Sequence, residues 1–481
     1  MKLLILTQTV DSHDPVLGFF HRWIGEFSHR FEQLTVVCLR EGAHALPHNV
    51  AVHSLGKEKG RASRLRYVLR LYRLIWRERN NYDAVLVHMN QEYVLLAGPF
   101  WLLFGKPIYL WRNHYAGSWA TNLAGRLCAQ VFCTSKSSYT ATFANTTLMP
   151  VGIDTGVFHP TPDASPLPHT ILSLGRIAPS KHVETIIEAV ALLAKKGVTC
   201  SLDIYGDALP EHANYLESLR ARVHESGLQE VVAFHGGVAN TDTPMVYAAH
   251  AVFVNASRSG MFDKTIFEAL ASGALVVAAS DDWKALAGEE WWFALDDAAQ
   301  LAQRLEYVLR LAPEIRHTTA EALRSRLVKP QSLEALGAAL QRAMTVSPRL
   351  TKTALLARYL FAGVTATATN LALTFLLERF TSLHYLVVVS LAVLAAVVVS
   401  FTLQKYVTFS GAHHSQTRTQ FGLFAAFALF NLCVNDVLVY LIFSVAGLHM
   451  LVVAEALAAV IVAGYSFFLY RHGIFKPKAR V

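Results

Sequence analysis

Residues 174–181 read Leu-Gly-Arg-Ile-Ala-Pro-Ser-Lys, directly after a short apolar run and directly before a helical pattern. Arg176 and Lys181 are therefore predicted to lie on one strand-to-helix turn, where both side chains can reach the same diphosphate. The N-terminus of the following helix adds partial positive charge behind them. This stretch predicts a phosphate site in a parallel α/β fold, and a solvated basic turn is the alternative explanation of the two cations.

On both sides of this stretch, short apolar runs alternate with amphipathic helical patterns. The predicted strands are residues 3–6, 34–38, 84–87, 108–111, 131–134, 171–174, 201–205, 231–234, 252–255 and 275–278. Such alternation is typical of parallel sheets covered by helices. A segment rich in proline, residues 160–168, separates the runs into two Rossmann-like domains, residues 1–150 and 151–345. Ligands of such doubly wound domains bind at the carboxyl ends of their strands, in the cleft between the two domains.

Residues 267–273, Phe-Glu-Ala-Leu-Ala-Ser-Gly, place a carboxylate on a helix just before the predicted strand at 275–278. Glu268 can accept hydrogen bonds from ribose hydroxyls there, as acidic residues do in other doubly wound nucleotide sites. A salt bridge or a cap within its own helix is the alternative. The second domain is thus predicted to offer cations for a diphosphate and a carboxylate for a ribose.

Three motifs of this domain together resemble a known family. They are Gly-Arg-x-x-Pro-x-Lys at 175–181, Phe-His-Gly at 234–236 and Glu-Ala-Leu-Ala-Ser-Gly at 268–273. Their combination resembles the retaining glycosyltransferase family 4, whose fold is GT-B, over most of residues 1–340. The resemblance implies an α/β protein of two Rossmann-like domains that binds a nucleoside-diphosphate sugar.

The resemblance also implies a role for individual residues. Arg176 and Lys181 would hold the donor diphosphate, and Glu268 would hold the ribose. Gly18, in the turn after the first strand, would let the chain approach the donor. His114 matches the histidine of the first domain that faces the transferred sugar, whereas a lone histidine is more often structural.

One position departs from the family pattern. Members usually carry two glutamates eight positions apart, and Gly260 stands where the partner of Glu268 would be. That glutamate usually contacts the donor sugar, so we expect the neighbouring Asp263 and Lys264 to supply substitute contacts. A degenerate binding module without activity is the alternative that this glycine leaves open.

The same residues suggest how the reaction proceeds. Departure of a nucleoside diphosphate builds negative charge, which a fixed arginine and lysine stabilise without a metal ion. The sequence contains no Asp-x-Asp motif of the kind used by metal-dependent transferases. We therefore expect a metal-independent enzyme with no cofactor besides its substrate, and the family implies retention of anomeric configuration. GDP, UDP and ADP donors are not distinguished.

The apolar residues that raise the hydrophobic fraction to 53% gather at the C-terminal end. Four stretches there have the length of membrane-spanning helices, residues 359–377, 385–403, 421–443 and 451–470. Residues 400–409 recur as 466–475, each with Ser-Phe at its start, a basic residue inside and phenylalanine at its end. This doubled pattern resembles the GtrA-like family of four-span proteins over residues 350–476. That family is associated with moving polyprenyl-phosphate-linked sugars or with supporting the enzymes that make them.

The basic residues predict the orientation of these helices. Lysines and arginines precede the first span, lie in the loop between the second and third spans, and follow the fourth span. In the other two loops, Arg379 is the only lysine or arginine. By the positive-inside rule both chain ends and the catalytic region are cytoplasmic, in a multi-pass protein of the bacterial inner membrane. The N-terminal apolar run is too short for a signal-peptide core.

Two further sets of residues are predicted to face lipid. In residues 61–79, apolar side chains recur at helical spacing, with four arginines on other faces: Arg66, Arg70, Arg73 and Arg77. This helix is predicted either to rest on an anionic membrane or to be an ordinary domain helix, and the two interpretations are held equal. Asp436 and Glu455, inside the spans, are candidates for contact with a lipid headgroup or a partner. For the asparagines within the spans, hydrogen bonding between helices is a better explanation than contact with a lipid or a partner.

Together these patterns predict a membrane-bound glycosyltransferase. It would move a sugar from a nucleotide sugar to a membrane-associated, polyprenyl- or lipid-linked acceptor in cell-envelope glycan assembly. The net charge of +8 suits an anionic membrane as well as nucleic acid, and the spans favour the membrane. The alternative from another class is a flippase or transport accessory for lipid-linked sugars with a fused transferase. The oligomeric state is not predicted.

Overall fold

The computed structural model describes residues 1–14, 16–60, 63–160, 166–260, 264–345, 352–409, 417–442 and 451–475. It divides into two compact units. The first unit comprises Met1–Ala97 and Pro107–Pro348, and the second comprises Gly98–Lys106 and Arg349–Val481.

The first unit begins with a seven-stranded parallel sheet of order β3-β2-β1-β4-β5-β6-β7. Its strands are β1 (Lys2–Val10), β2 (Gln33–Glu41), β3 (Val50–Ser54), β4 (Ala84–His88), β5 (Ile108–Trp111), β6 (Gln130–Cys133) and β7 (Thr146–Leu148). The helices that follow its strands are α1 (Gly18–Ser28), α2 (Arg64–Arg77), α3 (Gln91–Leu103) and α4 (Trp119–Leu127), and the end of α3 from Gly98 onward belongs to the second unit. The sequence did not reveal β3 and β7, which lie at the two edges and lack the fully buried apolar run of the central strands.

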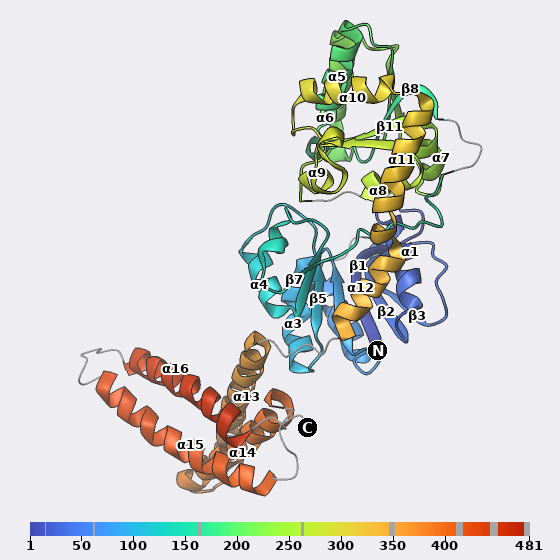
Figure 1. Ribbon diagram of the computed structural model, residues 1–481. Helices are drawn as coiled ribbons and strands as arrows, with labels where there is room; N and C mark the ends of the chain where they lie inside the picture. Colours follow the sequence, from blue (N-terminus) through green and yellow to red (C-terminus); the bar gives the residue numbers. More distant parts are fainter. Residues whose placement is uncertain are drawn as a thin grey trace. The chain divides into compact units, whose positions relative to one another are not determined.

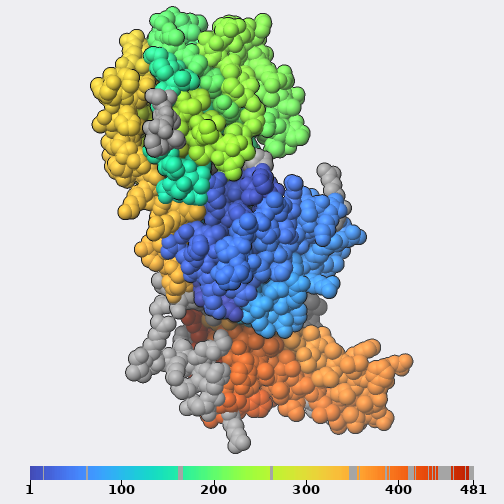
Figure 2. All heavy atoms as spheres, turned by 90° about the vertical axis from the view of Figure 1, so that its right-hand side faces the viewer, coloured from blue at the N-terminus to red at the C-terminus, as the bar shows by residue number. Residues whose placement is uncertain are grey.

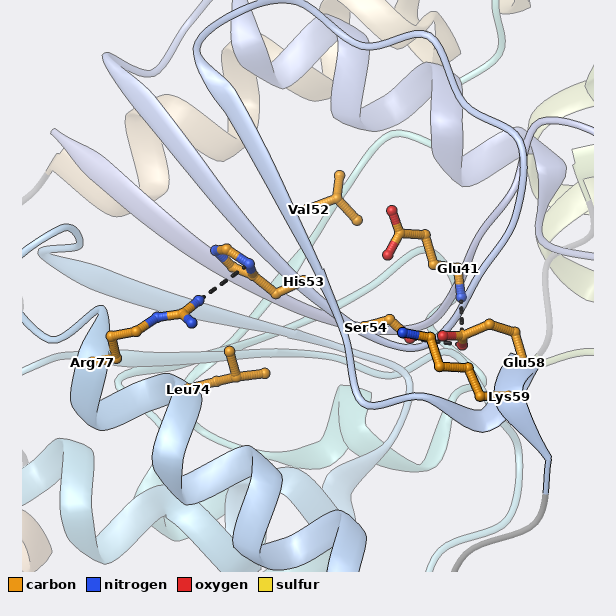
Figure 3. Close-up of a pocket in the computed structure, with 8 residues that line it drawn as sticks. All are labelled: Glu41, Val52, His53, Ser54, Glu58, Lys59, Leu74 and Arg77. Atoms are coloured by element: carbon orange, nitrogen blue, oxygen red, sulfur yellow. Dashed lines mark hydrogen bonds between the residues drawn. The ribbon is translucent and has the colours of Figure 1, made fainter.

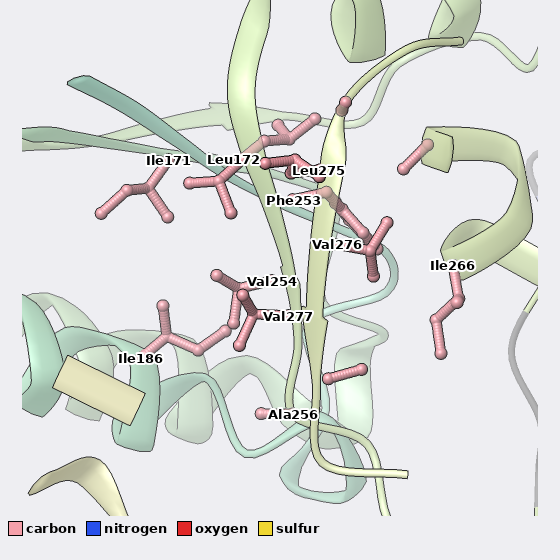
Figure 4. Close-up of a cluster of buried hydrophobic side chains, with 14 of the residues drawn as sticks. Ile171, Leu172, Ile186, Phe253, Val254, Ala256, Ile266, Leu275, Val276 and Val277 are labelled. Atoms are coloured by element: carbon pink, nitrogen blue, oxygen red, sulfur yellow. The ribbon is translucent and has the colours of Figure 1, made fainter. Parts of the chain in front are cut away.

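A second parallel sheet follows, of order β10-β9-β8-β11-β12. Its strands are β8 (Leu167–Leu174), β9 (Ser201–Tyr205), β10 (Val232–Gly236), β11 (His250–Asn255) and β12 (Leu275–Ala278). Its helices are α5 (Val183–Lys195), α6 (Ala213–Glu225), α7 (Thr243–Ala248), α8 (Lys264–Ala271), α9 (Asp281–Ala287), α10 (Ala298–Arg310) and α11 (Pro313–Leu327). Side chains such as Leu172, Phe253 and Val276 fill its core (Figure 4). The predicted α/β class with two Rossmann-like sheets is confirmed.

The helix that ends the predicted second domain packs against the first one. This helix, α12 (Leu333–Thr345), inserts Leu336 and Leu340 into the apolar core around α1. Gln341 Nε2 donates to the carbonyl of Arg30 at 2.9 Å. The chain therefore crosses from the second domain back onto the first through α11 and α12, the gold segment of Figures 1 and 2. The predicted second domain, residues 151–345, therefore includes a helix that packs on the first domain.

Among the residues of the second unit that the structure describes, a helix lies at each position predicted for a span. These helices are α13 (Lys352–Phe380), α14 (Tyr385–Leu403), α15 (Thr417–Tyr440) and α16 (Leu451–Leu469). By length and composition, Arg358–Phe380 and Leu391–Thr408 are long and apolar enough to cross a membrane. Thr419–Asn435 and Val460–Leu469 are shorter apolar segments within the described residues.

The sequence repeat of this unit is also a structural repeat. After α14 the chain forms a π-helical turn, η7 (Gln404–Thr408), and after α16 it forms a matching one, η10 (Tyr470–Ile474). Each turn ends at the repeated phenylalanine. The rings of Phe409 and Phe475 stack with centroids 5.3 Å apart and planes 16° apart, so the two repeats meet at equivalent residues.

Candidate active site

The predicted phosphate turn lies after β8, and glycines shape it. Gly206, at the end of β9, approaches so closely that an added Cβ would lie 1.8 Å from the carbonyl oxygen of Gly175. Both residues have positive φ, +153° for Gly175 and +142° for Gly206, which glycine adopts without strain. The amide of Ile177 donates to the carbonyl of Asp207 at 3.0 Å. The end of β9 thus holds the turn that carries Arg176.

Arg176 and Lys181 line one small hollow at this turn. Its walls come from the ends of β8, β9 and β11 and the start of α5. Arg176 is exposed, whereas the Lys181 ammonium donates to the Ser257 hydroxyl at 3.1 Å. Two cations that reach one hollow from a strand-to-helix turn can neutralise a bound diphosphate.

Glu268 lies on α8, next to β12, and is buried. The Tyr247 hydroxyl lies 3.3 Å from its Oε2 and donates to it. A carboxylate held by a buried hydroxyl keeps its second oxygen oriented, because its side chain has fewer available rotamers. This geometry suits a hydrogen-bond acceptor for a ligand hydroxyl.

Lys264, one turn before Glu268, reaches the first domain. Its ammonium lies 3.9 Å from the ring centroid of Phe19 and 4.7 Å from that of Trp23, both on α1. Burial lowers the pKa of Lys264 to about 7, and the charge of Arg22 acts in the same direction, while Glu268 opposes it. The predicted neighbour, Asp263, lies outside the described residues.

Sequence reasoning missed a histidine beside this lysine. His88 ends β4, its ring stacks on Phe20 at 3.9 Å, and its Nδ1 lies 3.2 Å from the hydroxyl of Thr7. Burial and the charge of Lys264 lower the pKa of His88 to about 3, so its ring is neutral at physiological pH. The sequence feature that could have identified His88 as a site residue is its position at the carboxyl end of a predicted strand.

The two predicted residues of the first domain lie in loops after strands. His114 follows β5, and its Nδ1 accepts a hydrogen bond from the amide of Ala116 at 2.9 Å. The same Nδ1 lies 3.2 Å from the carbonyl oxygen of Ala116. Gly18 begins α1, and a Cβ added there would lie 3.0 Å from the carbonyl oxygen of Ser12. The start of α1 therefore lies close to the backbone of the turn after β1.

Gly260, which replaces the family glutamate, contacts the first domain. Its φ is +100°, and an added Cβ would lie 2.8 Å from both the carbonyl oxygen of Ser137 and the Cβ of Tyr115. Its own carbonyl accepts a hydrogen bond from the Ser138 hydroxyl at 2.7 Å. The space that a glutamate would need is thus filled by the loops after β5 and β6.

The apolar side chains of α2 are largely exposed. Leu65, Leu69 and Trp76 are 67%, 61% and 52% exposed, and Tyr72, on the same side, is also exposed. Leu71 and Ile75 are the residues of this helix that pack inward. An ordinary domain helix would bury its larger apolar side, whereas α2 leaves that side exposed.

A polar hollow of about 510 Å³ lies beside α2 and is separate from the predicted donor site (Figure 3). Its lining residues are Glu41, Val52, His53, Ser54, Glu58, Lys59, Leu74 and Arg77. Arg77 Nη2 lies 3.4 Å from His53 Nδ1, and Arg70 donates to the carbonyl of Leu55 at 2.6 Å. Two of the four predicted lipid-facing arginines therefore have partners in the protein.

Among the polar residues of the predicted spans, Asn431 forms hydrogen bonds to a neighbouring helix. The side chains of Asp436 and Glu455 lie outside the described residues. Asn431, on α15, donates to the Ser466 hydroxyl at 3.0 Å and accepts from the Tyr465 hydroxyl at 2.5 Å. The hydrogen bonding between helices that was expected for an asparagine is thus observed there.

Two parallel Rossmann-like sheets with a basic turn after β8 define the GT-B class of fold. The Anabaena protein HepE, solved with UDP and glucose, superposes with a TM-score of 0.60 at 19% identity. That match covers 72% of this chain and 100% of HepE. Residues 168–310 match the family Glycosyl transferases group 1, and residues 358–475 match the GtrA/DPMS transmembrane domain. The chain therefore joins a glycosyltransferase group 1 domain to a GtrA/DPMS transmembrane domain, and both resemblances are confirmed.

Curated relatives match over part of their length. The mannosylfructose-phosphate synthase of Agrobacterium fabrum is 33% identical over 138 residues, which are 26% of this chain and 30% of that protein. The lipopolysaccharide core biosynthesis mannosyltransferase LpcC of Rhizobium leguminosarum is 29% identical over 215 residues, which are 43% of this chain and 58% of that protein. The chain thus spans well under two thirds of the length of these relatives.

Proposed function

We propose that the chain is a membrane-bound, retaining glycosyltransferase that moves a sugar from a nucleoside-diphosphate sugar to a lipid-linked acceptor in cell-envelope glycan assembly. The observation that carries this proposal is the hollow after β8, where Arg176 and Lys181 reach one space. A glycosyltransferase group 1 domain contains this hollow.

In the proposed reaction these two cations do the electrostatic work. The bond between the sugar and the diphosphate breaks, and the leaving oxygen takes the electron pair. Arg176 and Lys181 stabilise the negative charge that develops, without a metal ion or another cofactor. Glu268 accepts from the ribose hydroxyls, and Gly18 lets the turn after β1 approach the donor. The acceptor hydroxyl attacks the face that the leaving group vacates, its proton passes to the departing diphosphate oxygen, and the configuration is retained.

The remaining predicted residues contact the sugar. The His114 ring can form a hydrogen bond with a sugar hydroxyl. Asp263 and Lys264 take over contacts that the missing glutamate would make. The Lys264 ammonium is supported in this role by its position between α8 and the start of α1.

Lipid contacts set the location of the reaction in this proposal. The exposed apolar side of α2 enters the headgroup region, and Arg66 and Arg73 meet lipid phosphates beside it. Asp436 and Glu455 contact headgroups from the spans, which cross the inner membrane with both ends cytoplasmic. The similarity to LpcC, a mannosyltransferase of lipopolysaccharide core biosynthesis, supports an acceptor held by a lipid.

A panel of nucleotide sugars tests the proposal. Binding and hydrolysis are measured with the detergent-purified full-length protein and with the double variant Arg176→Ala/Lys181→Ala. A second double variant, Lys195→Ala/Arg220→Ala, removes the same charges from exposed helix positions as a control. We expect one donor to bind and turn over in wild type and control, and to fail in the first variant. Absence of binding for every donor would refute the transferase.

The GtrA/DPMS match over residues 358–475 supports one alternative, a flippase or transport accessory with a fused transferase. Reconstituted vesicles test it, because a translocase moves a fluorescent lipid-linked sugar between leaflets without a nucleotide sugar. A non-catalytic binding module is the other alternative. It predicts donor binding without turnover in the panel.

A further inference from the structure

The polar hollow beside α2 lies at the same edge of the first sheet as the candidate active site. Glu41 ends β2 and Ser54 ends β3, while His88 ends β4 and His114 follows β5. These are the carboxyl ends of parallel strands, where ligands of such sheets bind. In the order β3-β2-β1-β4-β5, the outer two strands are about 19 Å apart at the usual strand spacing. The hollow is therefore a separate place along one continuous edge.

Charged groups of both signs line this hollow, whose volume of about 510 Å³ lies within the range of about 300–1,000 Å³ that is common for ligand pockets. Arg77 lies at one end, and Glu41 and Glu58 lie at the other, with Lys59 beside Glu58 (Figure 3). A bound metal ion would face Arg77 and Lys59, and a bound phosphate would face the two carboxylates. The lining therefore favours a ligand without net charge.

The carboxylate of Glu58 is held in place. Its Oε2 accepts from the Ser54 hydroxyl at 2.7 Å and from the Glu41 amide at 3.3 Å. Burial acts to raise the pKa of Glu58, but these hydrogen bonds lower it below its ordinary value, so the group is charged at physiological pH. Both bonds use Oε2, so Oε1 can accept from a ligand hydroxyl. Hydrogen bonds to a charged acceptor are the stronger ones.

The opposite end of the hollow supplies donors. Burial lowers the pKa of His53, so its ring is neutral at physiological pH. Arg77 Nη2 donates to His53 Nδ1 at 3.4 Å, since a guanidinium has no acceptor atom, and its five N–H groups allow further contacts. A sugar hydroxyl both donates and accepts, so donors at one end and carboxylates at the other match a polyhydroxyl ligand.

The hollow lies away from the exposed apolar side of α2. At about 100° per residue, Leu74 and Arg77 are about 140° around the helix from the centre of that side. Arg70 donates to the carbonyl of Leu55 at 2.6 Å and so holds α2 against the loop after β3. With the apolar side in lipid, as proposed above, the hollow faces away from the lipid, which suits a water-soluble ligand.

We propose that this hollow is a saccharide subsite, which binds a neutral part of a glycan acceptor at a distance from the sugar that reacts. The inference rests on the proposed function and names the acceptor as a glycan of several sugars. A short oligosaccharide can follow the edge of the sheet from the ends of β4 and β5 to the ends of β2 and β3. Residues of the hollow then act on the affinity for the acceptor and not on bond formation.

Oligosaccharide binding without a nucleotide sugar tests the subsite. The full-length protein is placed in nanodiscs, because detergents with a maltoside headgroup would compete for the hollow. The probes are linear mannose and glucose oligosaccharides from the monosaccharide to the tetrasaccharide, and NMR titration gives their affinities. We expect one series to bind, and Glu41→Gln/Glu58→Gln to weaken it at least about tenfold, because two charged acceptors are lost. Glu314→Gln/Glu321→Gln, at exposed positions of α11, is the matched control and should bind like wild type.

A second variant separates binding from folding. Ser54→Ala removes one hydrogen bond that orients Glu58, so it should weaken saccharide binding less than the double variant does. Thermal unfolding midpoints are measured for every variant, and both hollow variants should unfold cooperatively near the midpoint of wild type. Equal saccharide affinity in wild type and Glu41→Gln/Glu58→Gln would overturn the proposal.

The remaining outcomes distinguish this subsite from the transferase itself. A wild-type protein that binds a nucleotide sugar but no saccharide refutes the subsite and leaves the transferase intact. Saccharide binding without binding of any nucleotide sugar supports the hollow as a carbohydrate site and refutes the transferase. Binding of glycerophosphoethanolamine in place of the saccharides would assign the hollow to a zwitterion and overturn the proposal.

Discussion

The carbonyl of Gly260 accepts a hydrogen bond from the Ser138 hydroxyl at 2.7 Å, although 122 positions separate the two residues. The contact joins the second Rossmann-like domain to the first. It lies at the position where the resembling family carries a glutamate. Since Ser137 and Tyr115 fill the space that a side chain would occupy, Gly260 is a close contact between domains.

Adding a side chain at this contact should weaken the interface. Gly260→Ala places a Cβ at positive φ and within 2.8 Å of two atoms of the first domain. Gly227→Ala is the matched control, because Gly227 also has positive φ (+68°) and open space around it. We expect Gly260→Ala to lower the free energy of unfolding by about 1–3 kcal/mol more than the control. Denaturant titration in detergent measures the difference, and equal losses would show that the interface is not crowded.

Lys264 should give the protein a characteristic pH dependence. Its folded pKa of about 7 lies below its ordinary value of 10.5. The unfolded chain therefore binds a proton between these values that the folded chain does not, so stability rises as pH increases from 7 to 10. Below pH 7 this contribution is constant. Lys264→Met should flatten the pH dependence of the thermal midpoint, whereas Lys195→Met, at an exposed position, should not. Parallel profiles for wild type and Lys264→Met would contradict the assignment.

The role of Glu268 can be tested by the ligand as well as by mutation. Glu268→Gln should weaken binding of the cognate nucleoside diphosphate by about tenfold, because hydrogen bonds to a charged acceptor are the stronger ones. The 2′,3′-dideoxy analogue lacks the hydroxyls, so its affinity should not change in the variant. Tyr247→Phe, which removes the hydrogen bond to Glu268, should have a smaller effect in the same direction. Calorimetry gives all the constants, and an equal loss for the analogue would assign Glu268 a structural role.

We expect the exposed apolar side of α2 to lie within the membrane, at a depth that can be measured. A fluorophore on Leu69→Cys should be quenched by bromine-labelled lipids in nanodiscs, because this side chain belongs to the apolar side of the helix. The same fluorophore on Lys195→Cys, in the second domain, is the control. Both variants are made with Cys433→Ser, since Cys433 is exposed and the other cysteines are buried or half-buried. Equal quenching at the two positions would place α2 away from lipid.

Local sequence determined most elements of this protein, with the edge strands β3 and β7 as exceptions. The alternation of apolar runs with helical patterns predicted both parallel sheets, and the apolar lengths predicted the helices of the membrane domain. The turn that carries Arg176 and Lys181 was predicted because a strand, two cations and a helix start are consecutive in the chain. Patterns with a period of two or 3.6 residues express backbone geometry directly, so they can be recognised without knowledge of the fold.

The tertiary structure alone decided which distant residues meet. It returned α12 to the first domain, placed Lys264 over Phe19 and Trp23, and brought His88 beside that lysine. Sequence did not predict the burial of Lys405 or the contact of Gly260 with Ser138. Such contacts depend on how whole sheets and helices pack. The periodicity of one segment does not indicate which distant segment it will contact. The turn of the candidate site was therefore recognisable in the sequence, whereas the neighbours of its residues were fixed by long-range packing.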